Sequence, residues 1–324
     1  MADLKVDLPS LAKVPPMFTD LAGAAKKCRA YGAAPFSAMD SALSNGRAGI
    51  INQLTSTHNR IRHEVDAFFG GVKRFAEDEG ENIREAVTLY ETLDHDLAAT
   101  LDQTLFDQPT QDEVKEMGGR SSDLDLDAPV LGGAYLPGDP AAYLRPLTDY
   151  RSYEPNWRHP LDTNDELSAA SLARDLIWYG SSFAARFGVC RPIDIIEEVV
   201  VPFTGDWAGI KACGDALHAL DLAVDPLLGN TVWISDWINV VWQGNAADSC
   251  WLHVRKLEQS LRGVSTPQRI LKLYGDAYHD VADEVKRLER IASDAALELL
   301  DWAIHSSAQG APGGRRRLHG MDND

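Results

Sequence analysis

The stretch that decides the fold is "IRHEVDAFFGGVKRFAEDEGENIREAVTLYETLDHDLAATL", residues 61 to 101. Its apolar residues recur in steps of three and four, with one interruption around Glu79 and Gly80. This spacing places them on one side of an α-helix, opposite a charged side. We therefore predict one long amphipathic helix over 61–101 that packs against a partner helix. The apolar positions are Ile61, Val65, Phe68, Val72, Phe75, Ile83, Val87, Tyr90, Leu93, Leu97 and Leu101.

Other segments show the same periodicity, so we expect helices before and after this one. Residues 8–43 have a looser helical pattern, which we expect to be broken at its prolines and at Gly32. Further helices are predicted over 165–187, with Gly188 as the stop, and over 206–228, 231–242 and 245–304. The last of these should bend or restart at Pro267, and "IIEEVVV", 195–201, favours a short helix over a strand. Almost no segment reads as a strand, so the fold class is all-α.

Residues 107–164 have a different composition, with many prolines, glycine pairs and acidic side chains. We predict an elongated helical bundle built from two antiparallel helical units, joined by this proline-rich acidic strap, whose aromatic residues pack onto a helical surface. The expected parts are a helical hairpin at 1–106, the strap at 107–164, a second helical unit at 165–305 and a disordered tail at 306–324.

Composition and charge exclude several classes of protein. The chain has 324 residues, 44% of them hydrophobic, and no apolar run near the roughly 18 residues that a membrane span needs. Its formal net charge of -18 repels nucleic acid and anionic lipid. The basic run Arg315 to Arg317 lies in the expected tail and is interpreted as a solvated charge run. We therefore expect no nucleic-acid partner and no membrane span.

No pattern indicates a catalytic centre, a metal or a cofactor. The four cysteines are widely spaced and are expected to be buried free thiols, although a Cys213–Cys250 disulfide stays open. The "DLDLD" run at 123–127 lacks the glycine and distant glutamate of a calcium loop. His58 and His63 are five residues apart, too far round a helix to share a metal. Nucleophile and phosphate-binding motifs are also missing. We expect no enzymatic activity and no cofactor.

The segment "VVWQGNAADSCW", residues 240 to 251, marks a joint between two predicted helices. Gly244 permits backbone angles that other residues resist, and Trp242 can cover the end of a bundle with its large ring. Asn245 is expected to be the N-cap of the next helix. A tight helix reversal explains the segment without any further function.

A second motif lies in the first unit, where "YETLD" places Tyr90 and Asp94 one helical turn apart. Together, Trp242-Gln243-Gly244 between helices and Tyr90-x-x-x-Asp94 near a helix end resemble the signals of WXG-type and PE-PPE-like substrates of the type VII (ESX) secretion system. Their order is similar to that in EspB-like, virulence-associated secreted proteins, and the first hundred residues resemble an EspC-like hairpin. The second unit has no Tyr-x-x-x-Asp of its own, because Ala282 stands four residues after Tyr278.

This resemblance implies a non-enzymatic secreted substrate that is exported folded and without a cleaved signal peptide. It would be cytoplasmic before export, and secreted or on the cell surface afterwards. The resemblance implies that Tyr90, Asp94, Trp242 and Gly244 come together as one patch for the secretion ATPase, with both rings and the carboxylate in direct contact with it. It further implies self-assembly into a homo-oligomer, or a cognate effector. The alternative is a cytoplasmic helical scaffold or chaperone for a neighbouring effector, in which both motifs are only architecture.

Overall fold

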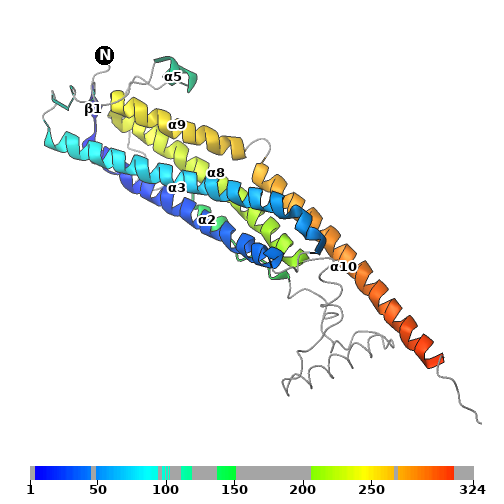
Figure 1. Ribbon diagram of the computed structural model, residues 1–324. Coiled ribbons are helices and arrows are strands. Elements are labelled where there is room, and N and C mark those ends of the chain that lie inside the picture. Colours follow the sequence, from blue (N-terminus) through cyan, green and yellow to red (C-terminus); the bar gives the residue numbers. More distant parts are fainter. Residues whose placement is uncertain are drawn as a thin grey trace, which may run out of the picture. The chain divides into compact units, whose positions relative to one another are not determined.

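A computed structural model describes residues 4–44, 49–93, 97–98, 100, 102, 111–118, 137–150, 206–265 and 269–309. Within these ranges the chain is mostly helical, with one pair of two-residue strands and short irregular segments such as 144–149, which confirms the predicted all-α class (Figure 1). The chain divides into two compact units. Unit 1 comprises 1–41, 54–148 and 209–280, and unit 2 comprises 42–53, 149–208 and 281–324.

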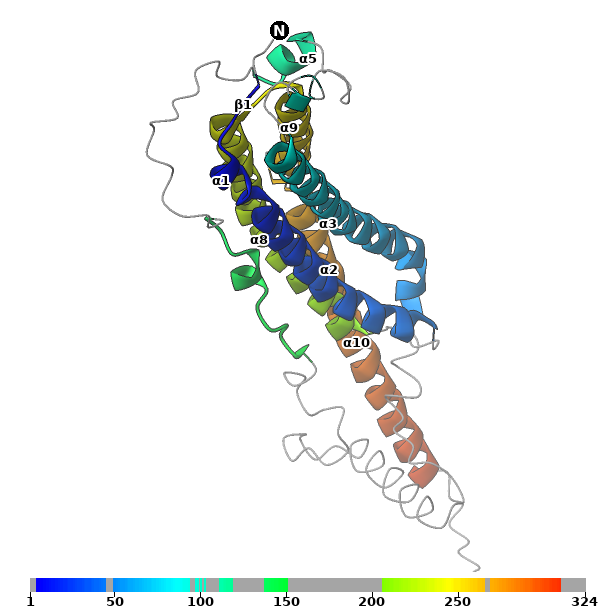
Figure 2. The same ribbon diagram turned by 90° about the vertical axis from the view of Figure 1, so that its left-hand side faces the viewer.

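Four long helices of unit 1 run alongside one another in both views (Figures 1 and 2). The helices are α1 Leu8–Leu11, α2 Val14–Ser44, α3 Thr55–Thr92, α5 Gln111–Glu116, α8 Trp207–Val241, α9 Asn245–Ser265 and α10 Ile270–Gln309, with short 3-10 helices η1 Gly49–Leu54 and η2 Pro140–Tyr143. The strands are β1 Lys5–Val6 and β2 Trp242–Gln243. The four long helices that run alongside one another are α2, α3, α8 and α9.

The α2 helix is continuous where the sequence predicted breaks. Pro15 and Pro16 lie in its first turn, where backbone N–H groups need no helical acceptor, so they start the helix and do not interrupt it. Pro35 lies inside the helix, which nevertheless continues to Ser44. The expected breaks at Gly32 and Pro35 are therefore wrong, because the buried face of α2 includes Cys28 on one side of them and Phe36 and Met39 on the other.

The α3 helix confirms the amphipathic pattern but not its predicted end. Ile61, Val65, Val72, Ile83 and Val87 are all buried along one side. The helix ends at Thr92, and Leu93 adopts an extended backbone with φ -100° and ψ 151°. The prediction of one helix to Leu101 was wrong because apolar spacing continues past the residue at which the backbone leaves the helix.

The α8 helix joins two segments that were predicted as separate helices. It passes through Pro226 and Gly229 and contributes a row of side chains with no exposed surface, Cys213, Leu217, Leu220, Val224, Leu227 and Ile234. A helix buried on most sides is expected to be apolar around much of its circumference. Burial of this row outweighs the cost of one internal proline.

The restart at Pro267 is confirmed, since α9 ends at Ser265 and α10 begins at Ile270. Arg269, just before α10, has a positive φ of 35°. Its guanidinium lies 3.2 Å from the carboxylate of Asp221 and 2.9 Å from that of Asp225, both on α8. These ion pairs anchor the start of α10 on α8.

Within unit 2, Trp207 is 2% exposed and contacts the ring of Tyr150 at 6.5 Å between centroids. The Lys286 ammonium lies 4.3 Å from the centroid of the same indole. Tyr150 belongs to the predicted strap, so one strap aromatic packs on a helix as expected. The helix at 165–187, "IIEEVVV", "DLDLD", Arg315 to Arg317 and Cys190 lie outside the described residues, and the expected domain boundaries stay a prediction.

Two further observations concern the described residues alone. Cys28, Cys213 and Cys250 are buried free thiols, so the Cys213–Cys250 disulfide does not form. Burial raises the pKa of Cys28 to about 12. Among the described helices, none carries a stretch long and apolar enough to cross a membrane.

Candidate functional site: the Trp-Gln-Gly joint

The joint between α8 and α9 is a tight reversal that depends on Gly244. Gly244 has φ +136°, a conformation that side-chain-bearing residues rarely adopt. A Cβ added there would also lie 2.7 Å from Oδ2 of Asp102 and 3.1 Å from Cδ1 of Leu4. Both the backbone angle and the surrounding atoms therefore require glycine at this position.

Tyr90 and Trp242 meet at this joint although they are far apart in the sequence. Their ring centroids are 6.1 Å apart with the planes at 75°, an edge-to-face arrangement. Such pairs contribute about 0.5–1.5 kcal/mol beyond the area that they bury. The structure thus brings together Tyr90, Trp242 and Gly244, three of the four predicted site residues.

The fourth predicted residue, Asp94, lies outside the described residues. The α3 helix ends at Thr92, two positions before it. Tyr90 and Asp94 were expected one turn apart on one helix, but only Tyr90 belongs to α3.

Asp102 is the acidic side chain that occupies the joint. One carboxylate oxygen accepts the backbone N–H of Asn245 at 2.7 Å, and the other accepts the backbone N–H of Ala246 at 2.9 Å. The Tyr90 hydroxyl lies 3.4 Å from the same carboxylate, and the Asn245 side-chain amide donates to the Asp102 carbonyl at 3.3 Å. With only 2% of its surface exposed, Asp102 caps α9 from a distant part of the chain.

This finding corrects the expected cap. Asn245 was predicted to cap α9 with its own side chain, but its side chain donates to the Asp102 backbone and Asp102 supplies the cap. Sequence reasoning missed Asp102 because local capping rules consider only residues next to the helix start. The only indication in the sequence was that an acidic residue, Asp102, follows shortly after the end of α3, the helix that carries Tyr90.

The segment that precedes α1 closes the other side of the joint. Lys5 and Val6 of β1 pair antiparallel with Gln243 and Trp242 of β2, and the Asp7 N–H donates to the Val241 carbonyl at 2.9 Å. In α1, which follows β1, the Ser10 carbonyl accepts a hydrogen bond of 3.1 Å from the indole N–H of Trp237 on α8. Figure 2 shows β1 beside the start of α9.

Both aromatic rings of the joint are buried by these neighbours. Tyr90 is 8% exposed and Trp242 is 2% exposed. Burial, and next the nearby Asp102 charge, raise the pKa of the Tyr90 hydroxyl, so it stays protonated at physiological pH. The expectation that both rings offer contact area to a partner is therefore not met in this structure. Their contacts stabilise the joint itself.

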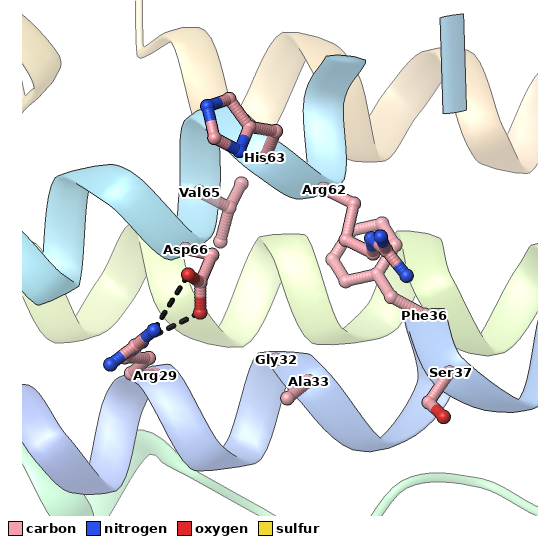
Figure 3. Close-up of a pocket in the computed structure, with 9 residues that line it drawn as sticks. All are labelled: Arg29, Gly32, Ala33, Phe36, Ser37, Arg62, His63, Val65 and Asp66. Carbon is pink, nitrogen blue, oxygen red and sulfur yellow. Dashed lines mark hydrogen bonds and ion pairs between the residues drawn. The ribbon is translucent and has the colours of Figure 1, made fainter. Parts of the chain in front are cut away.

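A separate pocket lies between α2 and α3, with a volume of about 250 Å³ (Figure 3). Its cationic side chains are engaged in ion pairs. The Arg29 guanidinium binds Asp66 with two hydrogen bonds of 2.6 and 2.7 Å, and Arg62 pairs with Asp40. Because neighbouring carboxylates balance both guanidiniums, the pocket is a poor receptor for an anion.

The two histidines near the start of α3 have different surroundings. His58 is buried and forms a hydrogen bond of 2.7 Å between its Nδ1 and the Tyr278 hydroxyl, whereas His63 lines the pocket of Figure 3. No group of three or more His, Cys, Asp or Glu side chains within the described ranges is arranged to hold a metal ion. The joint is thus the best-defined candidate site on the described residues.

No protein-family model, curated protein or solved structure matches the chain.

The contacts at the joint fix the shape of this end of unit 1. The joint fixes a bent backbone between two helices, with a buried carboxylate, a glycine and two aromatic rings that hold one another in place. The polar groups around it are half-buried or exposed, among them Lys5, Glu91, Gln243 and Asn245. A partner that contacts this end of unit 1 would meet those groups first.

Proposed function

We propose that the chain is a non-enzymatic substrate of a type VII secretion system, exported in folded form and recognised at the Trp-Gln-Gly joint. The observation that carries the proposal is the edge-to-face contact of Tyr90 with Trp242 at 6.1 Å. The two motifs lie far apart in the sequence and were matched separately. If they form one export signal, Tyr90 and Trp242 must be neighbours in the folded chain. If each motif is only a local helix feature, they need not be.

In this proposal, Tyr90, Trp242 and Gly244 act by fixing the shape of the joint, because the two rings are buried and the glycine is enclosed. The export ATPase would contact the surrounding polar groups and Asp94. Affinity at such a surface depends on preorganisation, since a rigid patch loses little conformational entropy on binding. Self-assembly after export, or delivery of a cognate effector, belongs to the proposal through the resemblance alone.

The rival function is a cytoplasmic helical scaffold or chaperone for a neighbouring effector. The burial of both rings is the observation that favours it, because rings enclosed in this way stabilise the joint and offer a partner no direct contact. The two functions differ in where the protein accumulates, so location decides between them.

The test is immunoblotting of culture filtrate against cell lysate for the wild type, Tyr90→Ala, Asp94→Ala and Trp242→Ala. Trp251→Ala is the matched control, because Trp251 is a second tryptophan that is 2% exposed and it lies on α9 beyond the joint. Circular dichroism establishes that each variant is folded. We expect wild type and folded Trp251→Ala in the filtrate and the three folded site variants in the lysate.

Wild type confined to the lysate would refute secretion and leave the scaffold function. Wild type in the filtrate, with export unaffected in all three folded site variants, would retain secretion but reject the joint as its signal.

A further inference from the structure

Part of the predicted strap, residues 137–148, belongs to unit 1 and runs beside α2 and α8 (Figure 2). The short 3-10 helix η2 is its regular element. Pro140 is the one residue of 137–145 that is buried, and the side chains on either side of it are half-buried or exposed. The segment is therefore held on the helices by a small set of specific contacts.

Asn230 of α8 binds the backbone of Gly138 through both ends of its amide. Its Oδ1 accepts the Gly138 N–H at 2.9 Å, and its Nδ2 donates to the Gly138 carbonyl at 2.9 Å. In an antiparallel sheet, a residue exchanges the same two bonds with its partner strand. The Asn230 amide, which has no exposed surface, thus takes the place of a partner strand.

Gly138 lies directly against α8, one helical turn away from Asn230. A Cβ at Gly138 would lie 2.6 Å from Cβ of Pro226 and 3.1 Å from its Cα. Pro226 and Asn230 are four residues apart, so they lie on the same face of the helix. The backbone pairing with Asn230 would suit any residue, but the contact with Pro226 requires glycine.

The residues after Gly138 connect this contact on α8 to a second one on α2. The Asp139 carboxylate accepts the Ala141 N–H at 3.0 Å, and Pro140 starts η2, where no N–H is needed. Beyond this turn, the Tyr31 hydroxyl of α2 donates to the Arg145 carbonyl at 2.8 Å. The Gly-Asp-Pro sequence therefore sets the path of the segment across both helices.

We propose that this face of α2 and α8 is a peptide-binding site. Residues 137–147 occupy it within the same chain, and an extended peptide with a Gly-Asp-Pro core from another molecule binds there once they are displaced. Backbone hydrogen bonds supply affinity and a steric limit at one position supplies specificity, as when a peptide adds to a sheet edge. The site shares no residue with the Trp-Gln-Gly joint, and the proposal does not depend on secretion.

The first experiment releases the chain's own segment with Gly138→Ala, which leaves α2 and α8 unchanged. The added Cβ should displace Gly138 from Pro226 and from the Asn230 amide. We expect hydrogen–deuterium exchange of 137–147, corrected for intrinsic rates, to become about tenfold faster because two hydrogen bonds are lost. Ala142→Ser, at an exposed position of η2, is the matched control and should leave the exchange unchanged.

The second experiment measures binding of the free peptide "PGDPAAYLRPL", the sequence of residues 137 to 147. A fluorescent form is titrated with each full-length chain and followed by anisotropy. We expect a Kd at least about tenfold lower for Gly138→Ala than for wild type, because a tethered segment competes at an effective concentration on the order of millimolar. The same peptide with alanine in place of its glycine should bind neither chain.

Asn230→Leu completes the set, because it releases the segment and also removes the amide that the added peptide needs. We expect fast exchange of 137–147 in this variant but no peptide binding. If it does not fold, Tyr31→Phe combined with Gly138→Ala replaces it, and the lost donor should weaken peptide binding about threefold.

Three results would overturn the proposal. The first is unchanged exchange of 137–147 in Gly138→Ala. The second is no peptide binding to Gly138→Ala although its segment is released. The third is a peptide affinity that is the same with and without the Asn230 amide or the Tyr31 hydroxyl.

Discussion

At the scale of single residues, Asp102 holds the joint together. Its two carboxylate oxygens accept the first N–H groups of α9, where the partial positive charge of the helix is greatest. Tyr90 lies against the same carboxylate. A carboxylate suits this set of donors, because it offers two acceptor oxygens and carries no N–H donor of its own.

Replacement of Asp102 by Asn tests this role. Asn keeps the shape but presents an amide nitrogen to one of the two N–H donors, so one backbone donor loses its acceptor. We expect the free energy of unfolding to fall by about 1–3 kcal/mol, measured by urea denaturation. Glu91→Gln removes one exposed negative charge near the end of α3 and is the control. A loss of equal size in the control would show that charge alone matters.

Gly244→Ala tests the backbone of the joint. The alanine Cβ would have to occupy a strained φ near +136° and approach Oδ2 of Asp102 to 2.7 Å. We expect a destabilisation of about 1–3 kcal/mol from the backbone strain alone. Gly263→Ala, an exposed helical position of α9 with open space around it, should instead stabilise the protein by up to about 1 kcal/mol. Thermal melting of both variants shows whether their effects have opposite signs.

At the scale of elements, apolar spacing predicted where helices occur better than where they end. The buried side of α3 and the restart at Pro267 were both confirmed. The breaks expected in α2 and between the two halves of α8 were wrong, because burial against other helices outweighs the local cost of Pro35 and Pro226. Long-range packing, which a single sequence does not display, decides these cases.

The same distinction applies to the candidate site. Trp242, Gly244 and Tyr90 belong to short motifs that can be recognised along the chain, and the structure places them together. Asp102 caps α9 although more than a hundred residues separate the two in the sequence. β1, which lies still earlier in the sequence, pairs with β2. Neither contact has a local pattern, so neither could be predicted from the sequence.

The contact of α9 with α3 through His253 and Glu79 gives a prediction about pH. A hydrogen bond of 2.8 Å to the Glu79 carboxylate raises the pKa of His253 above its ordinary value of about 6.5. The stabilisation is therefore fully present below about pH 6.5 and is lost as the pH rises through the folded-state pKa. His253→Gln should lower the urea midpoint more at pH 5.5 than at pH 8.5.

His58 gives the opposite sign and serves as the comparison. Burial lowers its pKa, so its contribution is present above about pH 6.5 and is lost as the pH falls toward the folded-state pKa. His58→Gln should therefore lower the urea midpoint more at pH 8.5 than at pH 5.5. The same pH trend in both variants would contradict these assignments.

At the scale of the whole molecule, the joint depends on segments from several parts of the sequence. Residues 4–7, the end of α3, Asp102 and the α8–α9 connection must all be in place before Trp242 and Gly244 have their observed surroundings. An export signal built in this way exists only in a folded chain. The proposed function therefore links recognition to the folding of unit 1, which a linear signal would not do.

This link can be separated from a general requirement for stability by comparing Asp102→Asn with Val254→Ala. Val254 has no exposed surface and lies within α9 beyond the joint, and its truncation should also cost about 1–3 kcal/mol. If the export machinery reads the joint, the fraction of protein in the culture filtrate should fall several-fold for Asp102→Asn and stay near wild type for Val254→Ala, with both variants matched in urea midpoint. Equal losses of export would mean that secretion depends on global stability, and the joint would then be architecture alone.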